Sequence, residues 1–361
     1  MAEPAEPVRA RICVLTGDPR LPDATKRGGR YNEEDAATHA GMTQALESLS
    51  GYQFEFLDDH AHVFEHFRLN HPDLVLNFCD TGYCNVAAQE LHVAALLEMF
   101  GIRYSGATPA CMAICYDKEI VRLLAEAHGV AVPREAYVEP EHPLDRLPDL
   151  YPALIKPNQA DGSLGITANA RVATPEQAKT YLEWFRSALP GRAALMQEYL
   201  PGTEYSVGLI GNADGDLQAL PLLEVDFSDL PAGLTPILSY ESKAFPDSPY
   251  WTDIKFRQAT VGDAVAGRMI ADAKLLFRRL GCRDYARIDF RCDAAGVPRL
   301  MEVNPNPAWA NDGKLALMAG FAGIPYAEML RMIVEAAVAR INKQDGVRPT
   351  PAVCPDPTGV R

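Results

Sequence analysis

The chain has 361 residues, and at about 150 residues per domain this length predicts two or three domains. Its 34 Lys and Arg against 48 Asp and Glu give a net charge of −14, which argues against a general nucleic-acid or membrane-surface binder, since such proteins need a basic face. With 48% hydrophobic and 23% charged residues, the composition is typical of a globular protein and not of a disordered one.

The two ends of the chain differ from its body. Residues 1–9 and the proline-containing tail at 342–361 are expected to be disordered. The acidic start has no apolar run, and no uncharged stretch approaches the roughly 18 residues of a membrane span. We therefore expect no secretory signal, no membrane contact and a cytoplasmic location.

Strands and helices alternate through residues 10–117, which predicts a doubly wound parallel sheet. In chain order we expect a strand at 11–17, a polar loop at 18–30, a helix at 34–49, strands at 52–57 and 74–78, and a helix at 89–100 that stops at Gly101.

The rest of the chain predicts two further domains, a small α+β unit at 118–200 and an antiparallel-sheet unit at 201–341. The expected elements are a helix at 118–128, a surface connection at 140–151, a strand at 153–156, a helix at 175–189 capped by Thr174, a strand at 195–199, and helices at 263–280 and 326–339.

The most informative segment is 285–304, where two alternating runs flank the turn Asp293-Ala-Ala-Gly296. A turn centred between Ala295 and Gly296 pairs Asp289 with Glu302, and Arg287 with Asn304. Period-2 alternation then places these four side chains on one face of the hairpin. The opposite face, with Ile288, Phe290, Met301 and Val303, is expected to enter a core.

Two adjacent carboxylates repel each other unless a cation lies between them. Oxygen ligands from Asp289, Glu302 and Asn304 suit Mg²⁺, which keeps waters and bridges substrate phosphates. The alternative interpretation is a salt-bridged, solvent-exposed hairpin.

A strand ending at Lys156 leads into a Gly/Ser loop, Gly162-Ser163-Leu164-Gly165. Backbone N–H groups in such a loop can bind phosphate oxygens without a net positive charge, and Lys156 would add a point charge. The loop is not a P-loop, and a plain hairpin turn is the alternative.

Other metal-like patterns are less favoured. The segment 58–66 contains three histidines but lacks the His-Glu-x-x-His arrangement. The eight cysteines include no Cys-x-x-Cys pair, and the nearest pairs, Cys79/Cys84 and Cys111/Cys115, are interpreted as buried free thiols.

Taken in order, the motifs resemble the ATP-grasp superfamily, and most closely the D-alanine–D-alanine ligases within it, over about residues 11–340. The matching passages are Gly101-Ile-Arg-Tyr-Ser-Gly106 with Tyr116-Asp-Lys118, Val130–Pro133, Lys156-Pro157 with the glycine loop, Gln197–Glu204, Tyr240–Lys243, Arg287–Asp289 and Glu302–Pro307.

This resemblance implies an ATP-grasp fold with α/β and α+β parts: an N-terminal doubly wound domain, a small central domain and a C-terminal antiparallel-sheet domain. It also implies a role for each matching residue. The ATP phosphates would be held by Lys118, Lys156 and the loop at Gly162, Ser163 and Gly165, and Lys243 would contact the γ-phosphate. Adenine would be contacted by Glu198, Tyr199 and Leu200, and ribose by Glu204. Arg287 would stabilise an oxyanion, and two Mg²⁺ ions, with Mn²⁺ as a substitute, would be held by Asp289, Glu302 and Asn304.

The implied reaction is ligation of a carboxylate to an amine. The donor carboxylate attacks the γ-phosphate of ATP, and the amine then displaces phosphate from the acyl phosphate. The expected partners are small molecules, and a homodimer is implied by the resemblance alone.

The substrate half departs from the ligase pattern. The family's His-Gly passage reads Phe78-Cys-Asp-Thr-Gly-Tyr-Cys-Asn85 here, and its substrate-binding serine is replaced by Gly313, with Lys314 beside it. Glu33, or Glu34 beside it, is a candidate for the donor ammonium, and Lys314 is a candidate for the acceptor carboxylate.

These departures favour a ligase of specialised metabolism with a substrate other than D-alanine. A cell-wall D-alanine–D-alanine ligase is one alternative, and a non-catalytic ATP-binding sensor or partner subunit is another.

Overall fold

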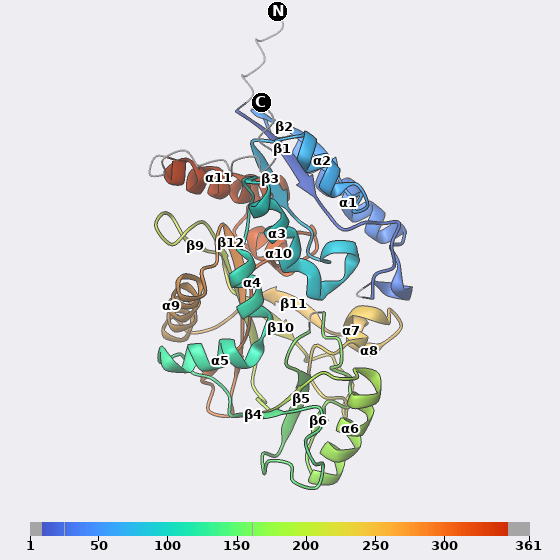
Figure 1. Ribbon diagram of the computed structural model, residues 1–361. Coiled ribbons are helices and arrows are strands. Elements are labelled where there is room, and N and C mark those ends of the chain that lie inside the picture. Colours follow the sequence, from blue (N-terminus) through green and yellow to red (C-terminus); the bar gives the residue numbers. More distant parts are fainter. Residues whose placement is uncertain (1–8, 25, 161, 346–361) are drawn as a thin grey trace, which may run out of the picture.

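The protein was analysed as a computed structural model, which describes residues 9–345 except Thr25 and Asp161. Its backbone forms a three-stranded, a four-stranded and a six-stranded sheet (Figure 1). This arrangement confirms the predicted combination of a parallel α/β unit with two antiparallel units. The disorder expected for residues 1–8 and 346–361 concerns segments outside the described residues.

The first unit is built on a parallel sheet of order β2-β1-β3. Its helix α1 begins with a capping box between Asn32 and Asp35, and α4 begins at Pro109 after the N-cap Thr108. The elements are β1 (Ala10–Leu15), α1 (Glu33–Glu47), β2 (Tyr52–Leu57), α2 (Val63–Leu69), β3 (Leu74–Asn77), α3 (Glu90–Met99) and α4 (Pro109–Tyr116).

The second unit is an antiparallel sheet of order β4-β7-β5-β6, with α6 packed against it (Figure 1). Helix α6 starts as predicted, because the Thr174 hydroxyl accepts the Gln177 N–H at 3.3 Å. The elements are α5 (Lys118–Ala127), β4 (Glu135–Val138), β5 (Ala153–Pro157), β6 (Arg171–Val172), α6 (Pro175–Ala188) and β7 (Ala194–Glu198).

The third unit contains a larger sheet of order β11-β10-β8-β12-β13, with β9 paired to β8. Its strands are β8 (Glu204–Ile210), β9 (Gln218–Ala219), β10 (Leu223–Asp226), β11 (Lys255–Gln258), β12 (Tyr285–Cys292) and β13 (Pro298–Asn304). Its helices are α7 (Glu241–Ala244), α8 (Pro249–Thr252), α9 (Asp263–Leu280), α10 (Lys314–Phe321) and α11 (Tyr326–Asp345).

The large sheet separates two apolar cores. Phe277 of α9 belongs to the same buried cluster as Ile288 and Phe290, whereas Leu315 and Met318 of α10 belong to the other. Helix α10 comes close to β8 because Gly208 has no side chain: a Cβ at that position would lie 2.8 Å from Met318 Cε. The side chains of α10 therefore pack directly against β8 at this glycine.

The predicted hairpin register is confirmed for its polar pairs, Asp289 with Glu302 and Arg287 with Asn304. The register then shifts between Asp289 and Phe290, so that Phe290 pairs with Leu300. The prediction that Met301 enters the core was wrong, because this bulge turns its side chain toward a pocket that it lines.

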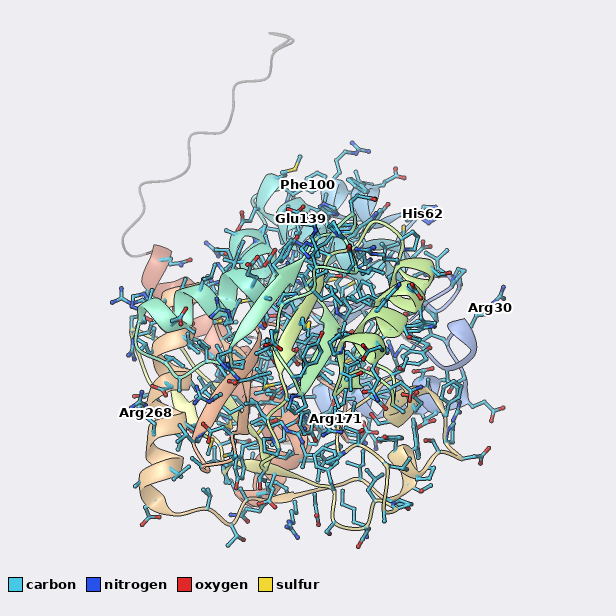
Figure 2. The ribbon with its side chains drawn as sticks, turned by 90° about the horizontal axis from the view of Figure 1, so that it is seen from below. Arg30, His62, Phe100, Glu139, Arg171 and Arg268 are labelled. Carbon is cyan, nitrogen blue, oxygen red and sulfur yellow. The ribbon has the colours of Figure 1, made fainter. Side chains whose placement is uncertain are left out.

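The last helix is longer than predicted. Helix α11 runs to Asp345, past the expected end at residue 339 and into the expected tail. Figure 2 shows side chains over the whole molecule, with Arg30 and Arg268 at opposite edges. Among the described residues, no single helix is long and apolar enough to cross a membrane, and α10 and α11 meet that requirement only as a pair bent by 106°.

Candidate active site

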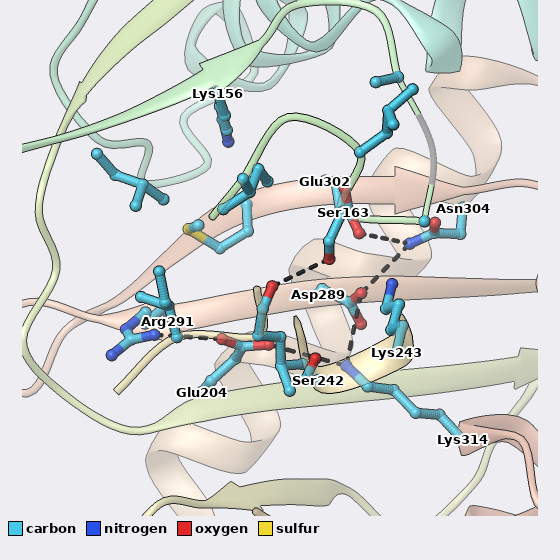
Figure 3. Close-up of a pocket in the computed structure, with 18 of the residues that line it drawn as sticks. Lys156, Ser163, Glu204, Ser242, Lys243, Asp289, Arg291, Glu302, Asn304 and Lys314 are labelled. Carbon is cyan, nitrogen blue, oxygen red and sulfur yellow. Dashed lines mark hydrogen bonds and ion pairs between the residues drawn. The ribbon is translucent and has the colours of Figure 1, made fainter. Parts of the chain in front are cut away.

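A pocket of about 360 Å³ lies where the second unit faces the larger sheet (Figure 3). It is lined by six cationic and five acidic side chains, so this region carries no excess of negative charge although the chain does. The predicted site residues that line it are Lys118, Lys156, Gly162, Ser163, Glu198, Tyr199, Leu200, Glu204, Lys243, Arg287, Asp289, Glu302, Asn304 and Lys314.

The oxygen-bearing side chains of the hairpin converge on one point of this pocket. Asn304 Nδ2 lies 3.3 Å from Asp289 Oδ2 and 3.5 Å from Glu302 Oε1, and Ser206 Oγ donates to Asp289 Oδ1 at 2.6 Å. Rotating the Asn304 amide by half a turn would direct its oxygen toward the same point. Two carboxylates and an amide oxygen form a donor set that fits Mg²⁺.

The Asp289 carboxylate stays ionised in spite of its burial. Burial raises the pKa of Asp289, but the charges of Arg287 and Lys314 outweigh that effect and hold the pKa below its usual range. Arg287 Nε lies 3.0 and 3.1 Å from the two Asp289 oxygens. An anionic carboxylate is the form that a metal ion requires.

Lys156 is held at the end of β5 by residues that the sequence analysis did not identify. Its side chain is buried, with 3% of the residue exposed, and Nζ donates to Gln197 Oε1 at 3.2 Å. Gln197 Nε2 in turn donates to Glu135 Oε2 at 2.6 Å. Gln197 lies on β7 and Glu135 on β4. Only the pairing of β4 with β7, and of β7 with the strand that carries Lys156, shows that the three side chains lie on the same face of the sheet.

The charge of Lys156 depends on this network. Burial lowers the pKa of Lys156, and the negative charge of Glu135 partly restores it. Replacing Glu135 with Gln should therefore lower the Lys156 pKa further. A lysine is charged only below its pKa, so ATP affinity should begin to fall at a lower pH than in the wild type, as measured by ATP binding between pH 7 and 10.

The matched control is Glu139→Gln, at an exposed position just after the same strand, which should leave this pH profile unchanged. Identical profiles for Glu135→Gln and the wild type would show that the network does not set the charge of Lys156.

The glycine loop and the segment around α7 lie together over the pocket. Ser163 Oγ donates to Leu238 O at 3.0 Å, the Tyr240 N–H to Ile166 O at 2.7 Å, and the Ala168 N–H to Glu241 Oε1 at 3.1 Å. These bonds join the two loops that carry Ser163 and Lys243.

The loop conformation itself requires glycine. Gly162, Ser163 and Gly165 have φ values of 64°, 61° and 77°, in the left-handed region. Gly165 lies beside the pocket and not in its lining, and a Cβ there would come within 2.6 Å of Leu189 Cδ1. Lys118 Nζ donates to Ala160 O at 2.6 Å, so this lysine is anchored to the start of the loop.

The predicted adenine and ribose residues follow β7 and begin β8. The Glu198 carboxylate accepts two hydrogen bonds from Arg134, its backbone N–H at 2.9 Å and its Nε at 2.8 Å. The Glu204 carboxylate lies 3.3 Å from Arg291 Nη1, and Arg291 is a further buried pocket residue that the motifs did not indicate. Because the Glu198 carboxylate is already bonded to Arg134, the backbone groups of this segment are the ones left to contact a base.

The two predicted substrate residues lie in different places. Lys314 Nζ is inside the pocket, 3.2 Å from Ser206 Oγ. Glu33, by contrast, is an exposed residue in the first turn of α1 and does not line the pocket. The prediction for Glu33 stays without geometric support.

Of the other metal-like patterns, the histidines separate, whereas Cys111 and Cys115 come together with a third buried cysteine, Cys282. Among the described residues the three histidines of 58–66 form no common cluster, and His60 is buried between Thr16 O and the Cys84 N–H. The seven described cysteines are free thiols, as expected. Cys111 and Cys115 are joined by Cys282, which is distant in sequence, and Cys111 Sγ lies 3.8 Å from Cys282 Sγ.

Comparison with known protein families identifies the family of this chain. The family described as "D-ala D-ala ligase C-terminus" matches residues 145–335, more than half of the chain. The chain belongs to this ligase family. It is therefore an ATP-grasp ligase of the class that forms carbon–nitrogen bonds.

Two relatives illustrate how far this ligase has diverged. It is 30% identical to an uncharacterized protein, y4sG, of Sinorhizobium fredii over 69% of this chain and 70% of that protein. It is 27% identical to a D-alanine–D-alanine ligase of Bordetella petrii over 87% and 91% of the two chains.

Solved structures share the fold. A Bacillus anthracis D-alanine–D-alanine ligase complexed with ATP has a TM-score of 0.66 at 20% identity, covering 93% of this chain and all of that chain. The VanG D-Ala:D-Ser ligase of Enterococcus faecalis has a TM-score of 0.66 at 15% identity, covering 91% and 99%. The predicted resemblance to this family is confirmed.

Proposed function

We propose that this ligase joins an amino acid, or a related carboxylic acid, to an amine by an ATP- and Mg²⁺-dependent reaction through an acyl phosphate. The observation that carries this proposal is the single pocket in which three oxygen ligands, Asp289, Glu302 and Asn304, face the lysine-bearing strand and loops. A reaction between two anions, a carboxylate and a triphosphate, needs such a concentration of positive charge.

The residues of the chain have distinct roles in this proposal. Lys118 and Lys156 neutralise ATP phosphates, and the glycine loop covers them and excludes water from the acyl phosphate. Arg287, already beside Asp289, stabilises the oxyanion that forms when the amine attacks the acyl carbon. Bound Mg²⁺ would be held by Asp289, Glu302 and Asn304 and would offset charge on the transferred phosphoryl group.

The substrate is proposed to differ from D-alanine. The support is the passage Phe78–Asn85, which lacks the family's histidine, and Gly313 where the family has a serine. The loop before α10 also carries Trp309, which stacks on Phe78 at 5.7 Å and donates its Nε1–H to the Phe78 backbone oxygen. The departures from the family's substrate passages therefore support a ligase of specialised metabolism.

The sensor alternative makes the opposite prediction. A pure ATP-binding protein has no evident need for two metal carboxylates, and here both are kept beside the glycine loop and the lysines. The test is release of phosphate from ATP and Mg²⁺ across a panel of D- and L-amino acids and related acids, with mass analysis of the products.

At least one donor–acceptor pair should stimulate phosphate release and give a product one water lighter than the sum of its parts. ATP binding without turnover across the whole panel would support the sensor instead. D-alanyl-D-alanine as the preferred product would identify a cell-wall ligase and contradict the proposed change of substrate.

A further inference from the structure

Three cysteines meet at the junction between the first and third units. Cys111 Sγ lies 4.0 Å from Cys115 Sγ and 3.8 Å from Cys282 Sγ, and the three sulfur atoms all lie within 4.8 Å of one another. The three residues are only 2%, 6% and 5% exposed. The sequence analysis interpreted the first two as buried thiols, and the fold adds a third to the same group.

Two elements hold the sulfur atoms in place. Cys111 and Cys115 are one helical turn apart on α4, so their side chains lie on the same face of that helix. Cys282 follows α9, where the chain turns at Gly281 in the left-handed conformation (φ 74°). Helices α4 and α9 pack against each other, which brings the third sulfur onto that face of α4 (Figure 1).

The spacing of the sulfur atoms fits a tetrahedral zinc site. Zn²⁺ binds thiolate sulfur at about 2.3 Å, so two sulfur ligands at the tetrahedral angle lie about 3.8 Å apart. The two distances from Cys111 Sγ, 3.8 and 4.0 Å, are close to this value. Among the described residues no further His, Cys, Asp or Glu joins the group, and Zn²⁺ accepts three protein ligands with a small molecule in the fourth position.

A positive charge accompanies the three thiols. Arg283 follows Cys282 directly; its Nε donates to Gly106 O at 2.8 Å, just before α4, and its Nη2 is buried without a hydrogen-bond partner among the described residues. Hydrogen bonds with Cys115 and Cys282, and then the charge of Arg283, lower the pKa of Cys111. Three thiolates carry three negative charges, and Zn²⁺ together with Arg283 carries three positive charges. The buried group is then neutral, which avoids the cost of an uncompensated buried charge.

We propose that Cys111, Cys115 and Cys282 bind one Zn²⁺, which clamps α4 to the turn that precedes β12. None of the three cysteines lines the nucleotide pocket, so the inference does not depend on the proposed function. Both clamped segments lead into that pocket, because α4 ends just before Lys118 and β12 carries Asp289. The ion binds the folded chain and not the unfolded one, so its binding free energy stabilises this junction.

The test measures metal content and not activity. The full chain is produced in medium supplemented with Zn²⁺, or with Cd²⁺ in a parallel culture, and is dialysed against EDTA to remove ions from the hairpin carboxylates and the surface. Elemental mass spectrometry should count one zinc per chain. The cadmium sample should show the near-ultraviolet absorption of thiolate-to-metal charge transfer, which oxygen ligands cannot produce. Cys111→Ala should lower the zinc content by about tenfold or more, abolish this absorption and lower the melting temperature.

Two controls locate the ion. Cys13→Ala removes an equally buried cysteine on β1 and should leave the zinc content and the absorption unchanged. Glu302→Gln, in the hairpin, should also leave both unchanged, which separates this site from the ions that accompany ATP.

Wild-type protein without zinc and without the absorption would overturn the inference, and this result does not depend on whether Cys111→Ala folds. A disulfide between two of the three cysteines in place of the metal, or copper in place of zinc, would also overturn it. Zinc retained in Cys111→Ala would show that the ion binds elsewhere and would overturn it as well.

Discussion

Replacing Glu302 with Gln should lower the rate of ATP-dependent ligation by about 100- to 1,000-fold, because loss of metal-assisted charge stabilisation at a phosphoryl group costs several kcal/mol at the transition state. ATP affinity should change by less than about tenfold, since the phosphates are also held by Lys118, Lys156 and backbone N–H groups of the glycine loop. The measurements are steady-state phosphate release with the best substrate pair and equilibrium ATP binding.

The control for this variant is Glu183→Gln, which makes the same change at an exposed position on α6 and should leave both quantities unaltered. Unchanged turnover in Glu302→Gln would remove the hairpin carboxylates from the mechanism. A parallel loss of ATP affinity and turnover would show that Glu302 acts in ground-state binding of the nucleotide and not in the transition state.

Replacing Asp284 with Asn should lower the free energy of unfolding by about 3–5 kcal/mol, because it leaves a buried arginine without its counter-charge. Asp284 is fully buried, and its two carboxylate oxygens accept Nε and Nη2 of Arg340 at 2.9 and 2.8 Å. It also accepts the Gly106 N–H at 2.8 Å and Asn212 Nδ2 at 3.0 Å. One carboxylate thus ties together the N-terminal unit, β12 and the last helix.

The loss in Asp284→Asn is measured by urea denaturation followed by circular dichroism. The comparison is Glu65→Gln, which breaks the exposed ion pair of Glu65 with Arg68 on α2 and should cost less than about 1 kcal/mol. Asparagine accepts the left-handed backbone that position 284 requires (φ 64°), so backbone strain does not account for the effect. Equal losses in the two variants would show that the network contributes nothing beyond a surface ion pair.

Local patterns predicted much of this protein. Alternation and the turn residues placed Asp289 opposite Glu302, because a hairpin joins two strands through a short loop whose register depends on nearby residues. Caps such as Thr174 act within one helical turn, so they are readable from adjacent residues. The ordered series of motifs likewise identified the superfamily and the residues around the nucleotide pocket.

Interactions between distant segments were not readable in this way. The register shift between β12 and β13, beyond which Met301 lines the pocket, left no sign in the alternation of the two strands. Glu135 and Gln197 reach Lys156 only because β4, β7 and β5 adjoin in that order. Arg291, whose contacts with Glu204 and the Leu200 backbone oxygen link separate strands, belongs to no motif.

The sequence by itself determined the fold class, the hairpin that presents the carboxylates and the ligase family, since each depends on short-range periodicity or on motifs read in order. Only the tertiary structure decided where Lys314 lies, because its neighbours Glu204, Ser206 and Asp289 belong to two strands that are remote from α10 along the chain. The tertiary structure also decided how an acidic chain forms a pocket without excess negative charge, since that balance arises when cationic side chains from separate units meet the hairpin.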